Sequence, residues 1–114
     1  MAKVAVTGGA GFIGSNLTRR LISEGHEVVV VDDLSTGLIS NADQAETTFH
    51  QVSITDAKAL HVALKDCQTI FHLAARGSVP RSIKSPVATH DVNATGTLNV
   101  LEVARNSGAH VIFS

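Results

Sequence analysis

A run of three glycines, Gly8, Gly11 and Gly14, lies between two segments of different periodicity and constrains the fold more than any other feature. Residues 3–7 before it are short, apolar and β-branched, which predicts a strand buried on both faces of a sheet. Residues 12–24 after it repeat apolar side chains at intervals of four, which predicts a helix with one apolar stripe. We therefore expect a buried strand, a tight glycine turn and a helix in direct succession.

The rest of the chain continues to alternate between strand and helix patterns. Further strands are predicted at residues 26–32, 49–52, 69–73 and 110–114. A helix is predicted after Asp56 as N-cap, and a longer one over roughly residues 87–106 with Gly108 at its end. Residues 35–48 have no period, so we expect a loop there that can hold a short helix. The side chains predicted to face the sheet are Ile13, Leu17 and Leu21 on the first helix, Ala57, Leu60 and Leu64 on the second, and Ala94, Leu98, Leu101 and Ala104 on the third.

This alternation predicts an α/β fold with a doubly wound parallel sheet in the strand order 3-2-1-4-5. The 114 residues suit one domain, residues 1–114, and 44% hydrophobic residues can fill its core. The chain ends on the fifth strand pattern, with no turn or helix after it. Because a parallel strand needs crossover helices, we expect the sheet to be truncated there and the chain to be part of a longer protein.

Composition excludes several classes of function. A net charge of −1 lacks the basic excess of a protein that binds nucleic acid or an anionic membrane. No apolar run approaches the ~20 residues of a membrane-spanning helix, and the N-terminus shows no export signal. Cys67 is the only cysteine, and the six histidines have no metal-ligand spacing, so no disulfide within the chain and no metal site is predicted. We expect a cytoplasmic protein with a small-molecule ligand.

The glycine turn and the acid after the second strand together predict a dinucleotide site. Gly8 permits the tight turn, Gly11 lets a pyrophosphate approach the backbone, and Gly14 lets the helix pack closely on the strand. The helix N-terminus offers N–H donors to the phosphates. Asp32, placed 18 residues after Gly14, can accept hydrogen bonds from the ribose hydroxyls and would repel a 2′-phosphate. Asp33 follows it and is either a second acid of this site or an exposed loop residue. The sequence therefore favours NAD over NADP.

Five motifs occur together: TGGAGFIG at residues 7–14, DDLSTG at 32–37, ITD at 54–56, HLAARGSVPRS at 72–82 and NATGTLNVLE at 93–102. In this order they resemble the extended short-chain dehydrogenase/reductases, most closely the NAD-dependent epimerase/dehydratase branch with its nucleotide-sugar 4-epimerases. The resemblance covers essentially the whole chain. It implies a Rossmann fold, NAD as cofactor, a nucleotide-sugar substrate and a homodimer paired through helices beside the sheet, for which the helix at residues 87–106 is the candidate.

The resemblance also assigns roles to individual residues. The backbone N–H groups of Phe12 and Ile13 would hold the pyrophosphate, a role compatible with helix packing. The residues implied to contact the adenosine half or the ribose and pyrophosphate are Ser35, Thr36, Gly37, Asp56, Ala57, Leu73, Ala74 and Ala75. Ser78 and Val79 would begin the sugar pocket, and Asn93 would help to order the active site. For Asp56 the alternative is a simple helix cap, and for Asn93 an exposed polar residue. His72 and Arg76 are interpreted as a buried structural histidine and a solvated arginine.

The sequence departs from this family's pattern at its C-terminus. The family's VIFSSS segment begins at residues 111–114 and stops, before the expected catalytic serine or threonine. The chain contains no tyrosine, so the family's Tyr-x-x-x-Lys pair, whose tyrosine removes the proton from the sugar 4-OH, is absent. We expect the parent protein to be an enzyme and this chain alone to be inactive. The alternatives are a 4,6-dehydratase or decarboxylase of the same superfamily, or a non-catalytic NAD-binding module.

Overall fold

The computed structural model describes residues 2–34, 47–74, 87 and 91–113. Within these residues one five-stranded parallel sheet has the order β3-β2-β1-β4-β5, as the sequence predicts. The elements are β1 (Lys3–Thr7), α1 (Phe12–Ser23), β2 (Glu27–Val31), β3 (Thr47–His50), α2 (Ala57–Leu64), β4 (Thr69–His72), a π-helix η2 (Asp91–Thr95), α5 (Gly96–Ser107) and β5 (His110–Phe113). None of the helices in these ranges has the length and apolar character needed to cross a bilayer.

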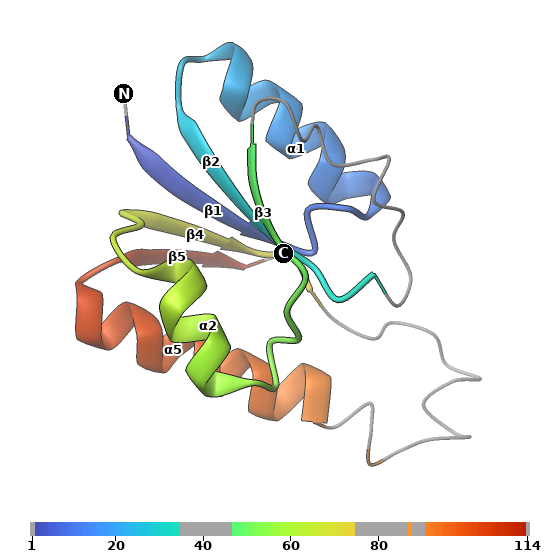
Figure 1. The fold of residues 1–114 in the computed structure, drawn as a ribbon, viewed down its shortest axis with the longest axis vertical. Coiled ribbons are helices and arrows are strands. Elements are labelled where there is room, and N and C mark those ends of the chain that lie inside the picture. The colour runs from blue at the N-terminus through green and yellow to red at the C-terminus, as the bar shows by residue number, and fades with distance from the viewer. Residues whose placement is uncertain (1, 35–46, 75–86, 88–90, 114) are drawn as a thin grey trace.

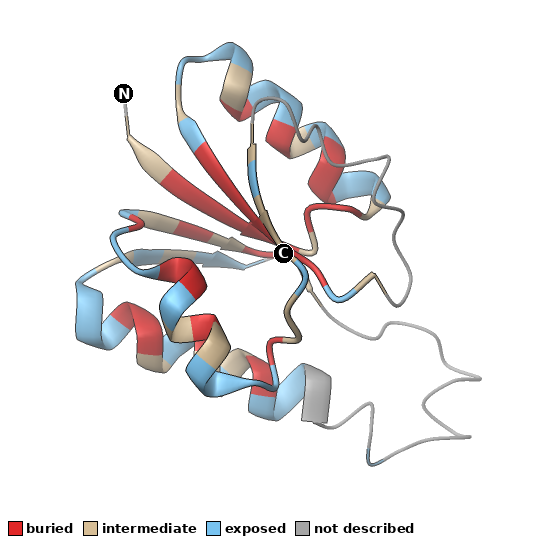
Figure 2. Cartoon of the chain, in the orientation of Figure 1, coloured by how far each residue is buried: buried red, intermediate tan, exposed pale blue. Residues whose placement is uncertain are grey.

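Helices cover both faces of the sheet, so side chains that alternate along the central strands are buried on both sides (Figure 1). On one face, Val4 and Val6 of β1 lie with Leu21 of α1 in one apolar cluster. On the other face, Ala5 of β1 lies in a second cluster with Leu60 of α2. Figure 2 shows the buried residues concentrated along β1 and β2 and on the inner sides of the helices. The continuous apolar runs of the sequence are explained by this two-sided burial.

The apolar stripe predicted for the longest helix is confirmed at Ala104 and wrong at its other three residues. Leu98 and Leu101 are 58% and 42% exposed, and Ala94 is also exposed. The buried residues of α5 are instead Gly96, Val100, Val103 and Ala104, which follow the spacing i, i+4, i+7 and i+8 of a single helix face. Gly96 decides between the two faces, because a Cβ there would lie 2.5 Å from Ile54 Cδ1. The helix therefore packs on the sheet through its glycine side.

Two smaller corrections concern α1 and α2. Ile13 is 66% exposed instead of buried, while Gly14, Ser15 and Thr18 form the buried side of α1 together with Leu21. The Thr18 hydroxyl donates to the Gly14 carbonyl at 2.7 Å, and because its proton is satisfied within the helix, Thr18 can lie in an apolar interface. In α2 the predicted Ala57 is exposed, and Leu60, Ala63 and Leu64 are buried.

Element boundaries differ most in the third strand and at the start of the last helix. β3 covers Thr47–His50 instead of residues 49–52, because these four residues pair with Val28–Val31 of β2. The helix predicted from residue 87 shows a π-helix at Asp91–Thr95 before α5 begins. Its end at Ser107 is as predicted: Gly108 has a left-handed φ of 75° and donates its N–H to the Ala104 carbonyl at 2.7 Å.

Candidate functional site

The glycine turn holds the start of α1 directly against the end of β1. Gly8 has a φ of 76°, which favours glycine, and its N–H donates to the Val31 carbonyl at 2.7 Å. Its own carbonyl accepts the Gly11 N–H at 3.1 Å. A Cβ on Gly14 would collide with this Gly8 carbonyl oxygen. The turn and the first helical residues are therefore packed backbone on backbone, which is the role that the sequence predicts for Gly14.

The N-terminus of α1 is open to a ligand. Its N-cap, Gly11, provides no side-chain cap, and no acidic side chain lies in the first turn. The first N–H groups of a helix have no intrahelical acceptor, and the helix dipole gives them partial positive charge. A cavity of about 260 Å³ lies beside them, lined by Gly8, Gly11, Phe12, Ile13, Gly14 and Leu73. The N–H donors of the first turn, the helix dipole and the glycine backbone suit a pyrophosphate, so this cavity fits the dinucleotide predicted from the sequence.

Asp32 lies at the edge of the same turn. It is buried, with 8% of its surface exposed, at the position directly after β2. Its Oδ2 accepts the Ala10 N–H at 2.9 Å and its Oδ1 accepts the Leu34 N–H at 2.7 Å. None of the ion pairs between described residues includes this carboxylate. Because each carboxylate oxygen has a second lone pair, both can still accept a hydroxyl while the backbone holds the group in place.

A polar chain of side chains crosses the floor of this region. Thr7 and His72, the last residues of β1 and β4, are register partners, and Thr7 Oγ1 lies 2.8 Å from His72 Nδ1. On its other side the imidazole Nε2 lies 3.0 Å from Thr97 Oγ1 of α5. His72 is 5% exposed, and its burial lowers the pKa of the imidazole below its ordinary value. The interpretation of His72 as a buried structural histidine is confirmed.

The C-terminal ends of β1 and β4 are the place where the strand order reverses. The chain leaves β1 into α1 on one face of the sheet, whereas α5, which precedes β5, covers the other face (Figure 1). In doubly wound sheets, ligands bind in the crevice outside the strand ends at this point. The glycine turn and the polar chain both border it.

The structure brings Leu73 and Ala74 to the glycine turn. A Cβ on Gly8 would lie 3.0 Å from the Ala74 nitrogen, and both Leu73 and Ala74 are half-buried. Asp56 and Ala57 are exposed. Asp56 caps α2 by accepting the Ala59 N–H at 3.2 Å, as its alternative interpretation as a helix cap predicts.

The remaining assigned residues lie at the margin of the crevice or outside the described residues. Asp33 is exposed at the turn after β2, and Asn93 is exposed within the π-helix. Seven of the residues interpreted through the family resemblance lie outside the described residues: Ser35, Thr36, Gly37, Ala75, Arg76, Ser78 and Val79.

Four residues of the site were missed from the sequence. Gly9 is buried, and a Cβ there would lie 2.6 Å from Val30 Cγ1; its neighbour Ala10 donates to Asp32. The signal for Gly9 was a further glycine within the turn. Thr7 and Thr97 contact His72 on its two sides. For Thr7 the signal was present, since it and His72 are polar residues at the ends of two apolar strands that the predicted order makes neighbours.

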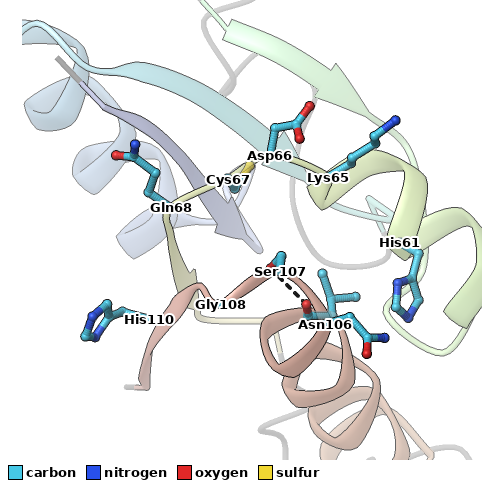
Figure 3. A pocket seen from close by; sticks show the side chains of 10 residues that line it. His61, Lys65, Asp66, Cys67, Gln68, Asn106, Ser107, Gly108 and His110 are labelled. Carbon is cyan, nitrogen blue, oxygen red and sulfur yellow. Dashed lines mark hydrogen bonds between the residues drawn. The ribbon is translucent and has the colours of Figure 1, made fainter.

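A larger cavity, of about 570 Å³, lies at the opposite end of the sheet (Figure 3). It is bordered by the C-terminal ends of α2 and α5, where Leu64 and Ser107 are the last helical residues, and by the start of β5. Helix C-termini expose carbonyl groups and disfavour phosphates. Among the described residues, no group of three or more His, Cys, Asp or Glu side chains gathers as a metal ion would require. The smaller cavity at the glycine turn is therefore the better candidate for the dinucleotide site.

Comparison with known proteins agrees with this geometry. Residues 4–114 match the profile of the NAD dependent epimerase/dehydratase family. UDP-glucose 4-epimerase of Mycolicibacterium smegmatis is 41% identical over 96% of this chain and 37% of its own length. UDP-glucuronic acid decarboxylase 1 of Danio rerio is 35% identical over 98% of this chain and 27% of its own length. A crystal structure of UDP-glucose 4-epimerase from Thermotoga maritima with UDP-glucose superposes with a TM-score of 0.93 at 37% identity, covering 97% of this chain and 37% of that one.

Proposed function

The chain belongs to the NAD dependent epimerase/dehydratase family, and we propose that it is the NAD-binding portion of a nucleotide-sugar 4-epimerase that acts on UDP-glucose and UDP-galactose. It spans about a third of the length of the relatives it matches. The observation that carries the proposal is the uncapped start of α1 packed on the glycine turn, with Asp32 fixed at its edge. UDP-glucose 4-epimerases recur among the relatives and structural neighbours.

In this proposal each part of the crevice holds a different part of the cofactor. The N–H groups of Phe12 and Ile13 bind the pyrophosphate, which Gly11 allows to approach the backbone. Asp32 accepts hydrogen bonds from the adenosine ribose, and Leu73 and Ala74 leave room beside the pyrophosphate. When bound, the nicotinamide of NAD would supply a reversible hydride acceptor for C4 of the sugar. The residues of this chain bind and orient the dinucleotide, and the proton transfer belongs to residues outside it.

A decarboxylase is the second candidate, supported by the Danio rerio relative. The glycine turn and Asp32 serve either reaction, because both begin with hydride transfer to the same cofactor. The distinguishing experiment is an assay of the longest protein encoded by the reading frame that contains this chain, with UDP-glucose and with UDP-glucuronate. Formation of UDP-galactose supports the epimerase. Release of CO₂ from UDP-glucuronate without any epimerisation would replace it by the decarboxylase.

The 114-residue chain alone is expected to show no epimerase activity even with added NAD. It contains no tyrosine, and the proposed reaction needs a tyrosine to remove the proton from the sugar 4-OH. The measurement is a coupled assay for UDP-glucose formation from UDP-galactose, run beside a complete UDP-glucose 4-epimerase as the positive control. Turnover above the uncatalysed background would show that another residue of this chain supplies the proton transfer.

We further propose that the parent protein is a homodimer paired through α5 and α2. Leu98 and Leu101 of α5 and Val62 of α2 are all exposed, and the two helices pack on the same face of the sheet. Leu98 and Leu101, three residues apart, lie on one side of α5, and neighbouring exposed apolar side chains are typical of an interaction surface. β5 offers a second apolar surface, with Ile112 and Phe113 about half exposed at the sheet edge.

Light scattering at increasing concentration is expected to show self-association of the chain. The double variant Leu98→Glu/Leu101→Glu is expected to be mostly monomeric at a concentration at which the unchanged chain is dimeric, because dimerisation would bury the charges of the two glutamates in the interface. Ile112→Glu on β5 is the comparison variant and is expected to leave the association through α5 in place. A monodisperse monomer for the unchanged chain, or loss of association only in Ile112→Glu, would contradict the proposal.

A further inference from the structure

The hydroxyl of Thr7 joins the ends of β1 and β4 through three contacts. Its oxygen accepts the Ala74 N–H at 3.2 Å and the Leu73 N–H at 3.0 Å, which is shared with the Thr7 main-chain carbonyl at 3.1 Å, and it lies 2.8 Å from His72 Nδ1. A hydroxyl oxygen has two lone pairs and one proton. Because both lone pairs receive backbone donors, only the hydroxyl proton is left for the imidazole. His72 Nδ1 must therefore be the acceptor, without a proton of its own.

The opposite side of the ring faces the start of α5. Nε2 lies 3.0 Å from Thr97 Oγ1, and the Thr97 hydroxyl donates its proton to the Asn93 carbonyl at 2.8 Å. Since the Thr97 proton is used in that bond, its oxygen is an acceptor toward the ring. Nε2 therefore carries the imidazole proton and donates it to Thr97. The two ends assign the same neutral tautomer independently.

We propose that His72, as the neutral Nε2–H tautomer, is a positioning residue of the NAD site, which orders the glycine turn against the π-helix through a one-way chain of hydrogen bonds. The chain begins at the amides of Leu73 and Ala74 and ends at the Asn93 carbonyl, so the proton of each link points away from the glycine turn. The proposal rests on the NAD site proposed above, since the crevice between these two ends is where that cofactor would lie.

The environment of the ring supports a single, neutral orientation. His72 is buried, and burial disfavours its charged form and so lowers the pKa. The Phe113 ring packs edge-on against the imidazole, with centroids 5.8 Å apart and planes at 82°, which restricts rotation of the ring. A doubly protonated imidazole would present a second donor to Thr7, whose lone pairs already accept the two amides.

The position of the chain explains why it would matter for the cofactor. Ala74, one of its first donors, is the residue whose nitrogen a Cβ on Gly8 would approach to 3.0 Å. Asn93, its last acceptor, lies in the π-helix, a helix type found often at functional sites. The chain therefore joins the residues beside the glycine turn to the π-helix that precedes α5. Loss of the middle link would free α5 to shift relative to the glycine turn.

Three proteins test the proposal: the unchanged chain, Thr97→Val, which removes the hydroxyl at nearly constant shape, and Thr97→Ser, which keeps it. Long-range ¹H–¹⁵N NMR spectra identify the tautomer of His72, with His72→Gln used to assign its signals among the histidines. Hydrogen exchange of the Leu73 and Ala74 amides and titration of NAD complete the measurements. Only the NAD titration needs the cofactor.

We expect the His72 proton on Nε2 in the unchanged chain. We expect Thr97→Val to speed exchange of the Leu73 and Ala74 amides and to weaken NAD binding, each about fivefold, the effect of losing one ordinary hydrogen bond. Thr97→Ser is expected to restore both values to within about twofold. A proton on Nδ1, or Thr97→Val with unchanged exchange and affinity, would overturn the proposal. If the unchanged chain does not bind NAD, the proposed function fails, and the tautomer and exchange data still decide whether His72 links the two ends.

Discussion

Replacing Gly14 with alanine is expected to lower the free energy of unfolding by about 3 kcal/mol, at the upper end of the cost of overpacking. The added Cβ would collide with the carbonyl oxygen of Gly8 and press on Cα of Gly9 at 2.9 Å. These are backbone atoms, so no side-chain rotation relieves the contact. Alanine favours a helix interior over glycine by about 1 kcal/mol, and this gain opposes the clash without cancelling it.

Urea denaturation of the two proteins measures the change, and Gly11→Ala is the matched control. Gly11 has a φ of −78°, which alanine adopts without strain, and its Cβ would meet only the Gly8 carbonyl oxygen at 3.3 Å. We expect this control to cost less than about 1 kcal/mol, the usual range of an N-cap change. Gly14→Ala with stability equal to that of Gly11→Ala would show that the turn rearranges at little cost. The close packing at Gly14 would then be no requirement of the fold.

The strand order could be predicted because it follows from features that are local in sequence. All strands except β3 contain a short apolar run, α1, α2 and α5 are long enough to serve as crossovers, and right-handed connections restrict the possible orders. The buried face of α5 could not be predicted in the same way. Apolar side chains lie on two of its faces, and the choice between Leu98 and Val100 depends on the fit of Gly96 against Ile54, two residues brought together only in the folded chain.

The candidate site also combines features that are local in sequence with contacts between residues far apart in the chain. The glycine turn and Asp32 are recognisable because both lie at fixed distances within one strand-helix-strand unit. The polar chain through His72 joins residues 65 positions apart on one side and 25 on the other, so only its Thr7–His72 pair follows from the predicted strand order, and its link to Thr97 does not. The sequence also did not predict that Asp32, besides its expected contact with the ribose, accepts the Ala10 N–H, because this hydrogen bond depends on the path of the glycine turn.

Asp32 is expected to make the chain bind NAD at least about tenfold more tightly than NADP. Its carboxylate is held at the end of β2 by two backbone N–H groups and has lone pairs left for the ribose hydroxyls. The 2′-phosphate of NADP would approach the same carboxylate. Like charges about 4 Å apart repel by about 1–4 kcal/mol, depending on solvent access, and each 1.4 kcal/mol is a tenfold loss of affinity. No Lys or Arg occurs between Asp33 and Gly37 to neutralise that phosphate.

Isothermal titration of NAD and NADP into the unchanged chain and Asp32→Asn measures the difference. Asp32→Asn should reduce the difference in affinity between NAD and NADP for two reasons. The neutral amide no longer repels the 2′-phosphate of NADP. Its NH₂ group is a donor that faces the N–H of Ala10 or Leu34, which disorders the side chain and weakens its contact with the ribose of NAD. Asp66→Asn is the charge-matched control: Asp66 lines the cavity at the opposite end of the sheet, and asparagine tolerates its φ of 70°. If the ratio of NAD affinity to NADP affinity falls equally in Asp32→Asn and Asp66→Asn, the preference is a general effect of net charge. Equal affinities for the two cofactors in the unchanged chain would show that Asp32 does not face the ribose.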